Sequence, residues 1–168
     1  MRSIRRILVA VKDPTSKSLP AITKAVQLAR ALGAELELFH SISSRLYIDA
    51  YSFNEPLRDM ERTMRSRCLE ELEAIATSVR RPGLEVAVSV EWDYPIYEAI
   101  VRRATRIRAD LILAERHGGR HFAPSLLHLI DWELLRLSPI PVLLVKTTGP
   151  YQQPTVLAAV DPTGSPAE

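Results

Sequence analysis

Hydrophobic positions along the chain follow two different periods, and the period changes at regular intervals. Short apolar runs, continuous or alternating and rich in Val, Ile and Leu, are typical of strands. Apolar residues that recur about every three to four positions are typical of helices. The pattern predicts strands at Arg6–Val11, Glu35–Ile42, Glu85–Trp92, Asp110–Glu115 and Val142–Lys146. It predicts helices at Leu19–Leu32, Pro56–Arg80, Ile96–Ile107 and Leu126–Leu137.

Residues at the ends of these segments support the boundaries. Ser18 stands where an N-cap is expected for the first helix, and Gly33 is placed to end that helix. Pro82 and Gly83 are placed to stop the long second helix. We expect the apolar stripe of this helix to face the core, and it comprises Leu57, Met60, Met64, Cys68, Leu72, Ile75 and Val79.

Strands and helices alternate along the chain, which predicts an α/β fold with a parallel sheet and helices on both of its faces. Open sheets of this kind bind ligands beyond the carboxyl ends of their strands. We therefore expect any functional site in the loops that follow the strands, at Lys12–Ser18, Ser41–Asn54, Asp93–Tyr94 and Glu115–Pro124.

A partial copy of the first strand follows the predicted domain. Thr155–Thr163 (TVLAAVDPT) repeats the order of Leu, Ala, Val, Asp, Pro and Thr found in Arg6–Thr15 (RILVAVKDPT). A match about one domain length away is typical of a tandem duplication. We expect a domain at 1–148, a linker at 149–154 and the first strand of a truncated second repeat at 155–168. The alternative is a chance recurrence of an apolar strand that ends in Asp-Pro.

Composition narrows the class of protein. The 168 residues are 46% hydrophobic and 25% charged, which fits one globular domain. The net charge of +2 is too small to indicate nucleic-acid binding by itself. The single cysteine, Cys68, excludes an internal disulfide and a cysteine-based zinc site. The apolar run behind the basic N-terminus is shorter than the roughly 7–15 residues of a signal peptide, so we expect a cytoplasmic protein.

Three segments carry a resemblance to a known family: Ile7–Val11 with Asp13, Glu98–Leu113 (EAIVRRATRIRADLIL) and Leu134–Lys146 (LLRLSPIPVLLVK). They make most of Ile4–Lys146 similar to the universal stress protein family. The pair Asp131-Trp132 is most similar to the first domain of tandem E-type members.

The resemblance implies an adenine nucleotide alpha hydrolase-like fold with five parallel strands in the order 3-2-1-4-5. It also implies a homodimer or pseudo-dimer that pairs through the last strand, Val142–Lys146.

In that family, a phosphate-binding pattern runs from the fourth strand into the last helix: Gly, two residues, Gly, nine residues, then Gly followed by Ser or Thr. Glycines let backbone N–H groups approach phosphate oxygens. Alignment without gaps places this pattern on Glu115, Gly118, His128 and Leu129, so only Gly118 matches. A carboxylate at the first position would repel a triphosphate. A shift of one or two residues would bring Gly119 into the pattern.

We therefore expect a non-catalytic stress-response protein with a degenerate phosphate-binding motif, no cofactor, and a role in dimerisation or partner binding. The alternative is a regulatory switch that binds AMP or ATP. A vestigial nucleotide site would comprise Asp13, Ser41, Arg116, Gly118 and Gly119. A hydrolase is not expected, because the sequence contains no Walker A loop, no Gly-x-Ser-x-Gly elbow and no visible activated nucleophile.

Several basic residues leave two interpretations open. Arg116, His117, Arg120 and His121 around the glycine pair form either a compact anion site or a solvated loop. A zinc site from His117, His121 and His128 lacks a cysteine, so we do not favour it. We expect four arginines to form a solvated helix face: Arg102, Arg103, Arg106 and Arg108. No aromatic residues that could stack on nucleic-acid bases are interleaved with them.

We expect His40 to be a semi-buried structural histidine at the end of the second strand. Cys68 lies on an apolar helix stripe without a CxxC motif, so we expect a structural thiol.

Overall fold

A five-stranded parallel sheet forms the centre of the protein, in the order β3-β2-β1-β4-β5. The computed structural model describes residues 3–43, 55–116, 124–146, 149 and 151–152. The strands are β1 (Arg6–Ala10), β2 (Glu35–Ile42), β3 (Val86–Trp92), β4 (Leu111–Glu115) and β5 (Val142–Val145). The fold class, the strand order and the approximate strand positions agree with the sequence-based predictions.

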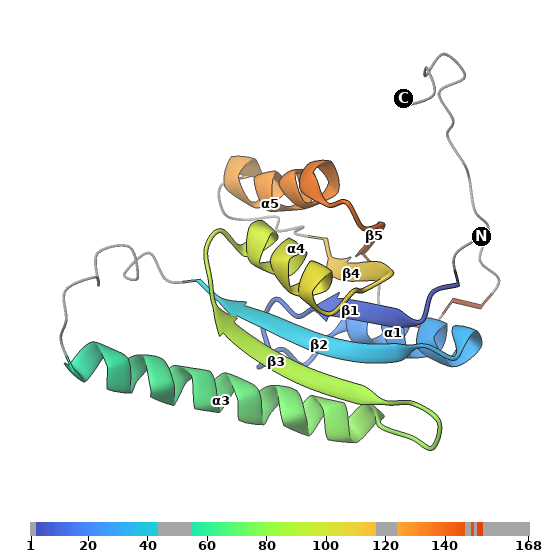
Figure 1. The fold of residues 1–168 in the computed structure, drawn as a ribbon, viewed down its shortest axis with the longest axis horizontal. Helices are drawn as coiled ribbons and strands as arrows, with labels where there is room; N and C mark the ends of the chain where they lie inside the picture. Colours follow the sequence, from blue (N-terminus) through green and yellow to red (C-terminus); the bar gives the residue numbers. More distant parts are fainter. Residues whose placement is uncertain (1–2, 44–54, 117–123, 147–148, 150, 153–168) are drawn as a thin grey trace, which may run out of the picture.

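Helices cover both faces of the sheet (Figure 1). They are α1 (Pro20–Leu32), α3 (Glu55–Val79), α4 (Ile96–Arg106) and α5 (Pro124–Leu137). Helices α1 and α3 pack on one face, while α4 and α5 lie together on the opposite face. The long α3 runs beside the edge strand β3.

Alternation along the strands separates the core into two apolar clusters. Leu36 and Leu38 of β2 belong to the cluster under α1 and α3, whereas Phe39 belongs to the cluster under α4 and α5. Successive side chains of a strand point to opposite faces, so a strand buried on both sides contributes to both clusters. Strand β1 does the same with Ile7 and Leu8, which are fully buried.

Two local predictions at helix ends have different outcomes. Gly33 ends α1 in the left-handed conformation with φ of 65°, as expected for a glycine C-cap. Ser18 is not the N-cap: α1 begins one position later, with Leu19 at the N-cap and no capping hydrogen bond from a side chain. The Ser18 amide instead donates to the hydroxyl of Ser16, and Pro20 starts the helix with its fixed φ.

The predicted apolar stripe of α3 meets the core only in its later turns. Leu72 and Ala76 are fully buried there, and the partly buried Cys68 packs against the core cluster to which they belong. Met60 and Met64, which were expected to face inward, are 43% and 41% exposed. The reason is geometric, because the first half of this long helix extends past the strands that it covers (Figure 1).

The segment after β5 returns to α1. Gln27 binds the backbone of Tyr151 at two points: its amide donates to the carbonyl at 2.6 Å, and its Oε1 accepts from the amide at 2.7 Å. The Lys24 ammonium lies 3.8 Å from the centroid of the Tyr151 ring. This part of the predicted linker is therefore docked on the domain, and the predicted second repeat at 155–168 lies outside the described residues.

Candidate functional site

The carboxyl ends of β1, β2 and β4 meet at one edge of the sheet, where parallel topology places ligand sites. The loop after β1 brings Lys12 and Asp13 to this edge, the end of β2 brings His40 and Ser41, and the end of β4 brings Glu115. The structure therefore gathers most of the predicted site segments that it describes.

Two hydrogen bonds within its own loop fix the orientation of the Asp13 side chain. Its Oδ1 accepts hydrogen bonds from the Thr15 hydroxyl at 2.7 Å and from the Thr15 amide at 2.9 Å. These two bonds lower the pKa of the Asp13 carboxyl and outweigh the opposing effect of burial, and the nearby His40 and Lys12 add smaller effects that also lower it. Asp13 is therefore an exposed, ionised carboxylate in a fixed orientation.

His40 lies beside Asp13 on the α3 side of the sheet edge. Its Nδ1 is 2.8 Å from the carbonyl oxygen of Val11, so the ring is tied to the end of β1. This contact agrees with the prediction of a semi-buried structural histidine.

Burial and the charge of Glu71 raise the pKa of the nearby Cys68 thiol, which disfavours a reactive thiolate.

A hollow opens on the other side of the edge, between the sheet and helices α4 and α5. Its floor is apolar and includes Phe39, Ile100 and Leu134. Among its described lining residues, the charged and polar ones are Lys12, Ser41, Glu115 and Asp131. Asp131 is 7% exposed, so an acidic side chain is buried in the wall that α5 contributes.

Ser41 and Arg116, two residues of the predicted nucleotide site, lie at the ends of different strands, β2 and β4. The Ser41 hydroxyl donates to the carbonyl of Asp93 at 3.0 Å, which ties the end of β2 to the loop after β3. The Arg116 amide donates to the carbonyl of Val145 at 2.8 Å and extends the β4–β5 ladder, while its side chain is exposed.

The glycine pair at the centre of the predicted phosphate pattern, Gly118 and Gly119, lies outside the described residues. His117 and His121, considered above as zinc ligands, also lie outside them. His128 and Leu129 belong to α5, but their side chains are outside the described part of the structure. Within the described ranges, no group of three or more His, Cys, Asp or Glu residues could hold a metal ion.

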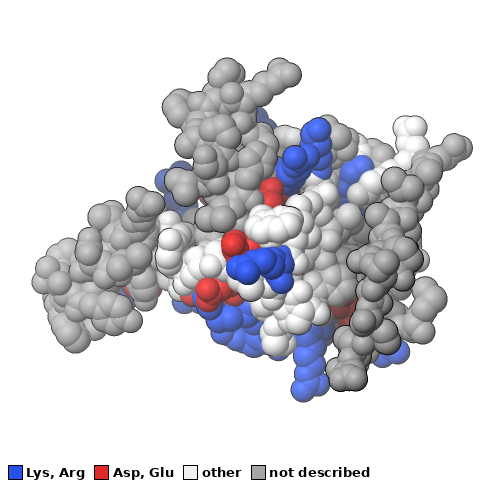
Figure 2. All heavy atoms as spheres, turned by 90° about the horizontal axis from the view of Figure 1, so that it is seen from above, with Lys and Arg blue, Asp and Glu red and all other residues white. Residues whose placement is uncertain are grey.

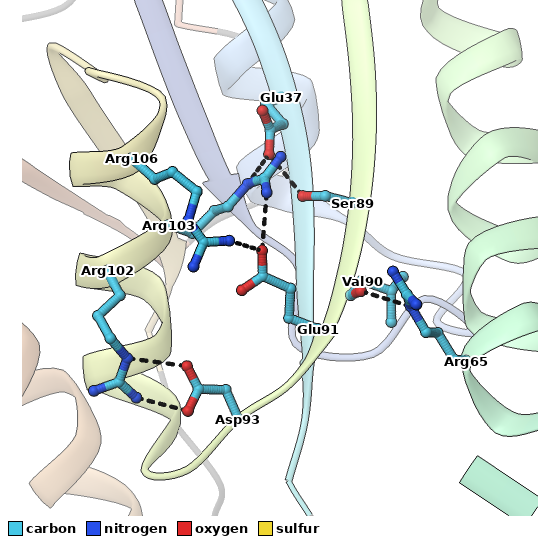
Figure 3. A network of polar contacts seen from close by, with 9 residues as sticks. All are labelled: Glu37, Arg65, Ser89, Val90, Glu91, Asp93, Arg102, Arg103 and Arg106. Carbon is cyan, nitrogen blue, oxygen red and sulfur yellow. Dashed lines mark hydrogen bonds and ion pairs between the residues drawn. The ribbon is translucent and has the colours of Figure 1, made fainter. Parts of the chain in front are cut away.

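The basic face of α4 is not a freely solvated arginine surface, which corrects the sequence-based prediction. Arg102 binds both carboxylate oxygens of Asp93, at 3.0 and 2.7 Å. Arg103 and Arg106 both contact Oε1 of Glu91 at 2.8 Å (Figure 3). The face above α4 and α5 accordingly shows basic and acidic side chains against each other, next to uncharged surface (Figure 2). Such pairing does not provide the unmatched positive charge that binds nucleic acid.

Sequence reasoning did not identify the acidic partners of this network. Glu37 lies on β2, Glu91 on the neighbouring β3 and Asp93 directly after β3. The Arg103 Nε lies 2.6 Å from Oε1 of the buried Glu37. The detectable pattern was an acidic residue at alternate strand positions, combined with three arginines on the crossover helix that follows. A strand that alternates polar and apolar residues does not by itself show whether its polar side chains face solvent or a neighbouring helix.

Comparison with known proteins identifies the family. The model of the universal stress protein family matches residues 3–146. The chain belongs to this family. It is 26% identical over 162 residues to Universal stress protein E of Photorhabdus laumondii, and 28% identical over 144 residues to Universal stress protein E of Escherichia coli K12. These alignments cover 96% and 83% of the chain.

The chain spans about half the length of these two curated relatives, 51% and 44% respectively. Among solved structures, a universal stress protein in complex with cAMP superposes with a TM-score of 0.57 at 24% identity, covering 88% of this chain and 100% of the other. This likeness confirms the universal stress protein fold. No helix in the described ranges is both long and apolar enough to cross a bilayer.

Proposed function

We propose that this chain is a non-catalytic stress-response protein of the cytoplasm that acts by pairing with a second copy or a second domain. In this proposal its phosphate pattern is degenerate and does not hold a nucleoside triphosphate. The observation that carries the proposal is the acidic lining of the hollow at the sheet edge. Among the described residues, Glu115 and Asp131 line it together with one basic residue, Lys12.

Charge at this edge disfavours a polyphosphate. Two unit charges of the same sign about 4 Å apart repel by about 4 kcal/mol at an effective dielectric constant near 20. The gap-free alignment puts Glu115 at the first glycine of the family pattern, where a backbone N–H must approach a phosphate oxygen. The ionised Asp13 adds a further negative charge at the end of β1.

The competing hypothesis is a switch that binds AMP or ATP through Asp13, Ser41, Arg116, Gly118 and Gly119. One structural neighbour is described as a complex with cAMP, a monophosphate, so an adenine nucleotide without the β- and γ-phosphates is the ligand to test first. Among the described candidates, the Ser41 hydroxyl is already used by the Asp93 carbonyl. This contact supports the proposal over the switch.

Pairing is expected through the last strand, Val142–Lys146. The sheet ends at β5, and Val142, Leu143 and Leu144 are half-buried, whereas Val145 is buried. An open strand edge is a surface that other strands add to. The two Universal stress protein E relatives are about twice as long as this chain, and we propose that their additional length covers the corresponding edge.

The test of the phosphate pattern is a thermal shift with magnesium and ATP, AMP or cAMP. We expect no shift for the wild-type chain and a stabilisation for the variant Glu115→Gly/His128→Gly/Leu129→Ser, which rebuilds the family pattern. A ligand at about 100 times its dissociation constant adds about 2.7 kcal/mol to stability. The variant Glu115→Gln is the matched control, because it removes the charge without freeing the backbone.

Two outcomes would count against the proposal. A shift of the wild-type melting temperature with ATP contradicts it directly. A rebuilt variant that folds and still ignores ATP shows that the pattern has been placed on the wrong residues.

A further inference from the structure

The two edges of the sheet differ in how their outward backbone groups are used. In a parallel ladder, alternate residues direct their N–H and C=O groups to opposite sides of the strand. In β3, the Glu85 carbonyl accepts from Leu36 of β2, so the residues two and four positions further along also face β2. Val86, Val88 and Val90 therefore direct their backbone groups away from the sheet.

Arginines of α3 and of the turn after it occupy this outer side. Arg80 donates to the carbonyl of Val86 from Nε at 3.2 Å and from Nη2 at 2.8 Å. Arg65 donates from Nε to the carbonyl of Val90 at 3.2 Å, and Figure 3 shows its side chain reaching from α3 to the strand. Only the position of Val88 remains between the two capped carbonyls.

The edge at β5 has no such covering in the described part of the chain. Pro141 and Val145 direct their carbonyls to β4, where they accept from Ile112 and Arg116. Val142 and Leu144 therefore direct their backbone groups outward, and no described side chain donates to their carbonyls. Within the described residues, the β3 edge is capped and the β5 edge is open.

We propose that Arg65 and Arg80 close the β3 edge against strand addition, so that a second copy of this chain can pair only through β5. This inference rests on the proposed pairing function and adds which edge of the sheet takes part in the pairing. Pairing of β5 with β5 uses the same surface on both copies and closes at two copies. Pairing of β5 with β3 leaves a β3 edge and a β5 edge unused at the two ends, so the assembly grows into a filament.

The capping works by occupying acceptors that a strand ladder needs. An incoming strand must donate to every second carbonyl of the edge, and guanidinium groups already bind two of them. The ion pair of Arg80 with Glu73 holds the first guanidinium in place. Between the two capped carbonyls, Val88 alone offers an outward carbonyl, and one position is too short a stretch to form a strand pair.

The experiment measures the molar mass of assemblies by light scattering over a concentration series, for the wild type and for Arg65→Met/Arg80→Met. We expect the wild type to converge on the mass of two copies and the variant to form larger species as concentration rises. The matched control is Arg62→Met/Arg67→Met, which removes two arginines of the same helix that are 79% and 76% exposed and contact only acidic side chains on α3. Hydrogen exchange locates the new contact, since the Val88 amide becomes protected only if β3 is paired.

Failure of this inference is distinguishable from failure of the pairing proposal. A monomeric wild type contradicts pairing through β5, while self-association of the arginine variant alone still supports the capping of β3. If the arginine variant folds by circular dichroism and keeps the wild-type mass at every concentration, the capping is overturned. If the double variant does not fold, the single variant Arg65→Met frees the Val90 carbonyl and is tested by the same measurements of mass and hydrogen exchange.

Discussion

The guanidinium of Arg103 on α4 holds the carboxylate of Glu37 on β2, with 2.6 Å between Nε and Oε1. The side chain of Glu37 is 10% exposed, and the Ser89 hydroxyl donates to the same oxygen at 2.6 Å. Burial alone lowers the pKa of Arg103, but the hydrogen bonds and charges of Glu37 and Glu91 outweigh it and raise that pKa. The pair joins α4 to the sheet (Figure 3).

Removal of Arg103 is expected to destabilise the fold strongly. Arg103→Met leaves the buried Glu37 carboxylate with the Ser89 hydroxyl as its remaining hydrogen-bond partner among the described residues, and breaking a buried ion pair in this way costs about 3 kcal/mol or more. Urea unfolding followed by circular dichroism measures the loss. Arg106→Met is the control, because the side chain of Arg106 is 61% exposed and a surface pair contributes about 0.2–1 kcal/mol. Equal losses for the two variants would contradict the role given to Arg103.

The lowered pKa of Asp13 makes the stability of the fold depend on pH in the acid range. Its pKa is lowered below the ordinary value of 3.8 mainly by the Thr15 hydroxyl and amide. A lowered pKa in the folded state stabilises the fold above the unfolded pKa, and this stabilisation is lost as pH falls through the folded pKa.

Thr15→Val removes the hydroxyl and should raise the Asp13 pKa towards its ordinary value. An NMR titration of the Asp13 carboxyl carbon measures this shift. The difference in stability between the wild type and the variant should be present at neutral pH and shrink below the ordinary pKa. A variant with an unchanged Asp13 pKa would show that the hydroxyl bond is not its cause.

The Tyr151 ring over Lys24 predicts that the segment after β5 stabilises the domain. Lys24 is only 4% exposed although it is a lysine, and the aromatic face lies 3.8 Å from its ammonium. Tyr151→Ala should cost about 0.5–2 kcal/mol, the range of a cation–π contact. Thermal unfolding measures it. Tyr151→Phe keeps the ring and should behave as the wild type, so an equal loss for both variants would assign the effect to the hydroxyl instead.

Periodicity and end residues were sufficient to predict the strands and helices, because the apolar pattern of each element matches the face that it buries. The family resemblance supplied the strand order, which local patterns do not contain. The errors arose where tertiary geometry decides the outcome. Met60 and Met64 continue a helical stripe, yet the sheet beneath α3 ends before them. A stripe predicts a face, but it does not predict how much of that face a neighbour covers.

The candidate site was only partly predictable for a related reason. Asp13 could be placed because it directly follows a buried strand, and its bonds to Thr15 are local in sequence. Asp131 and Glu37 could not be placed, because their surroundings come from elements far away in the chain. The contact of Arg103 with Glu37 joins residues 66 positions apart, which no local pattern reports.

The most direct test of the central claim is a calorimetric titration of the wild-type chain with ATP in the presence of magnesium. We expect no saturable heat up to millimolar nucleotide, because Glu115 and Asp131 line the edge at which the phosphates would lie. A saturable heat of binding at micromolar nucleotide, lost in an Asp13→Ala variant that remains folded, would contradict it and identify the protein as a nucleotide sensor.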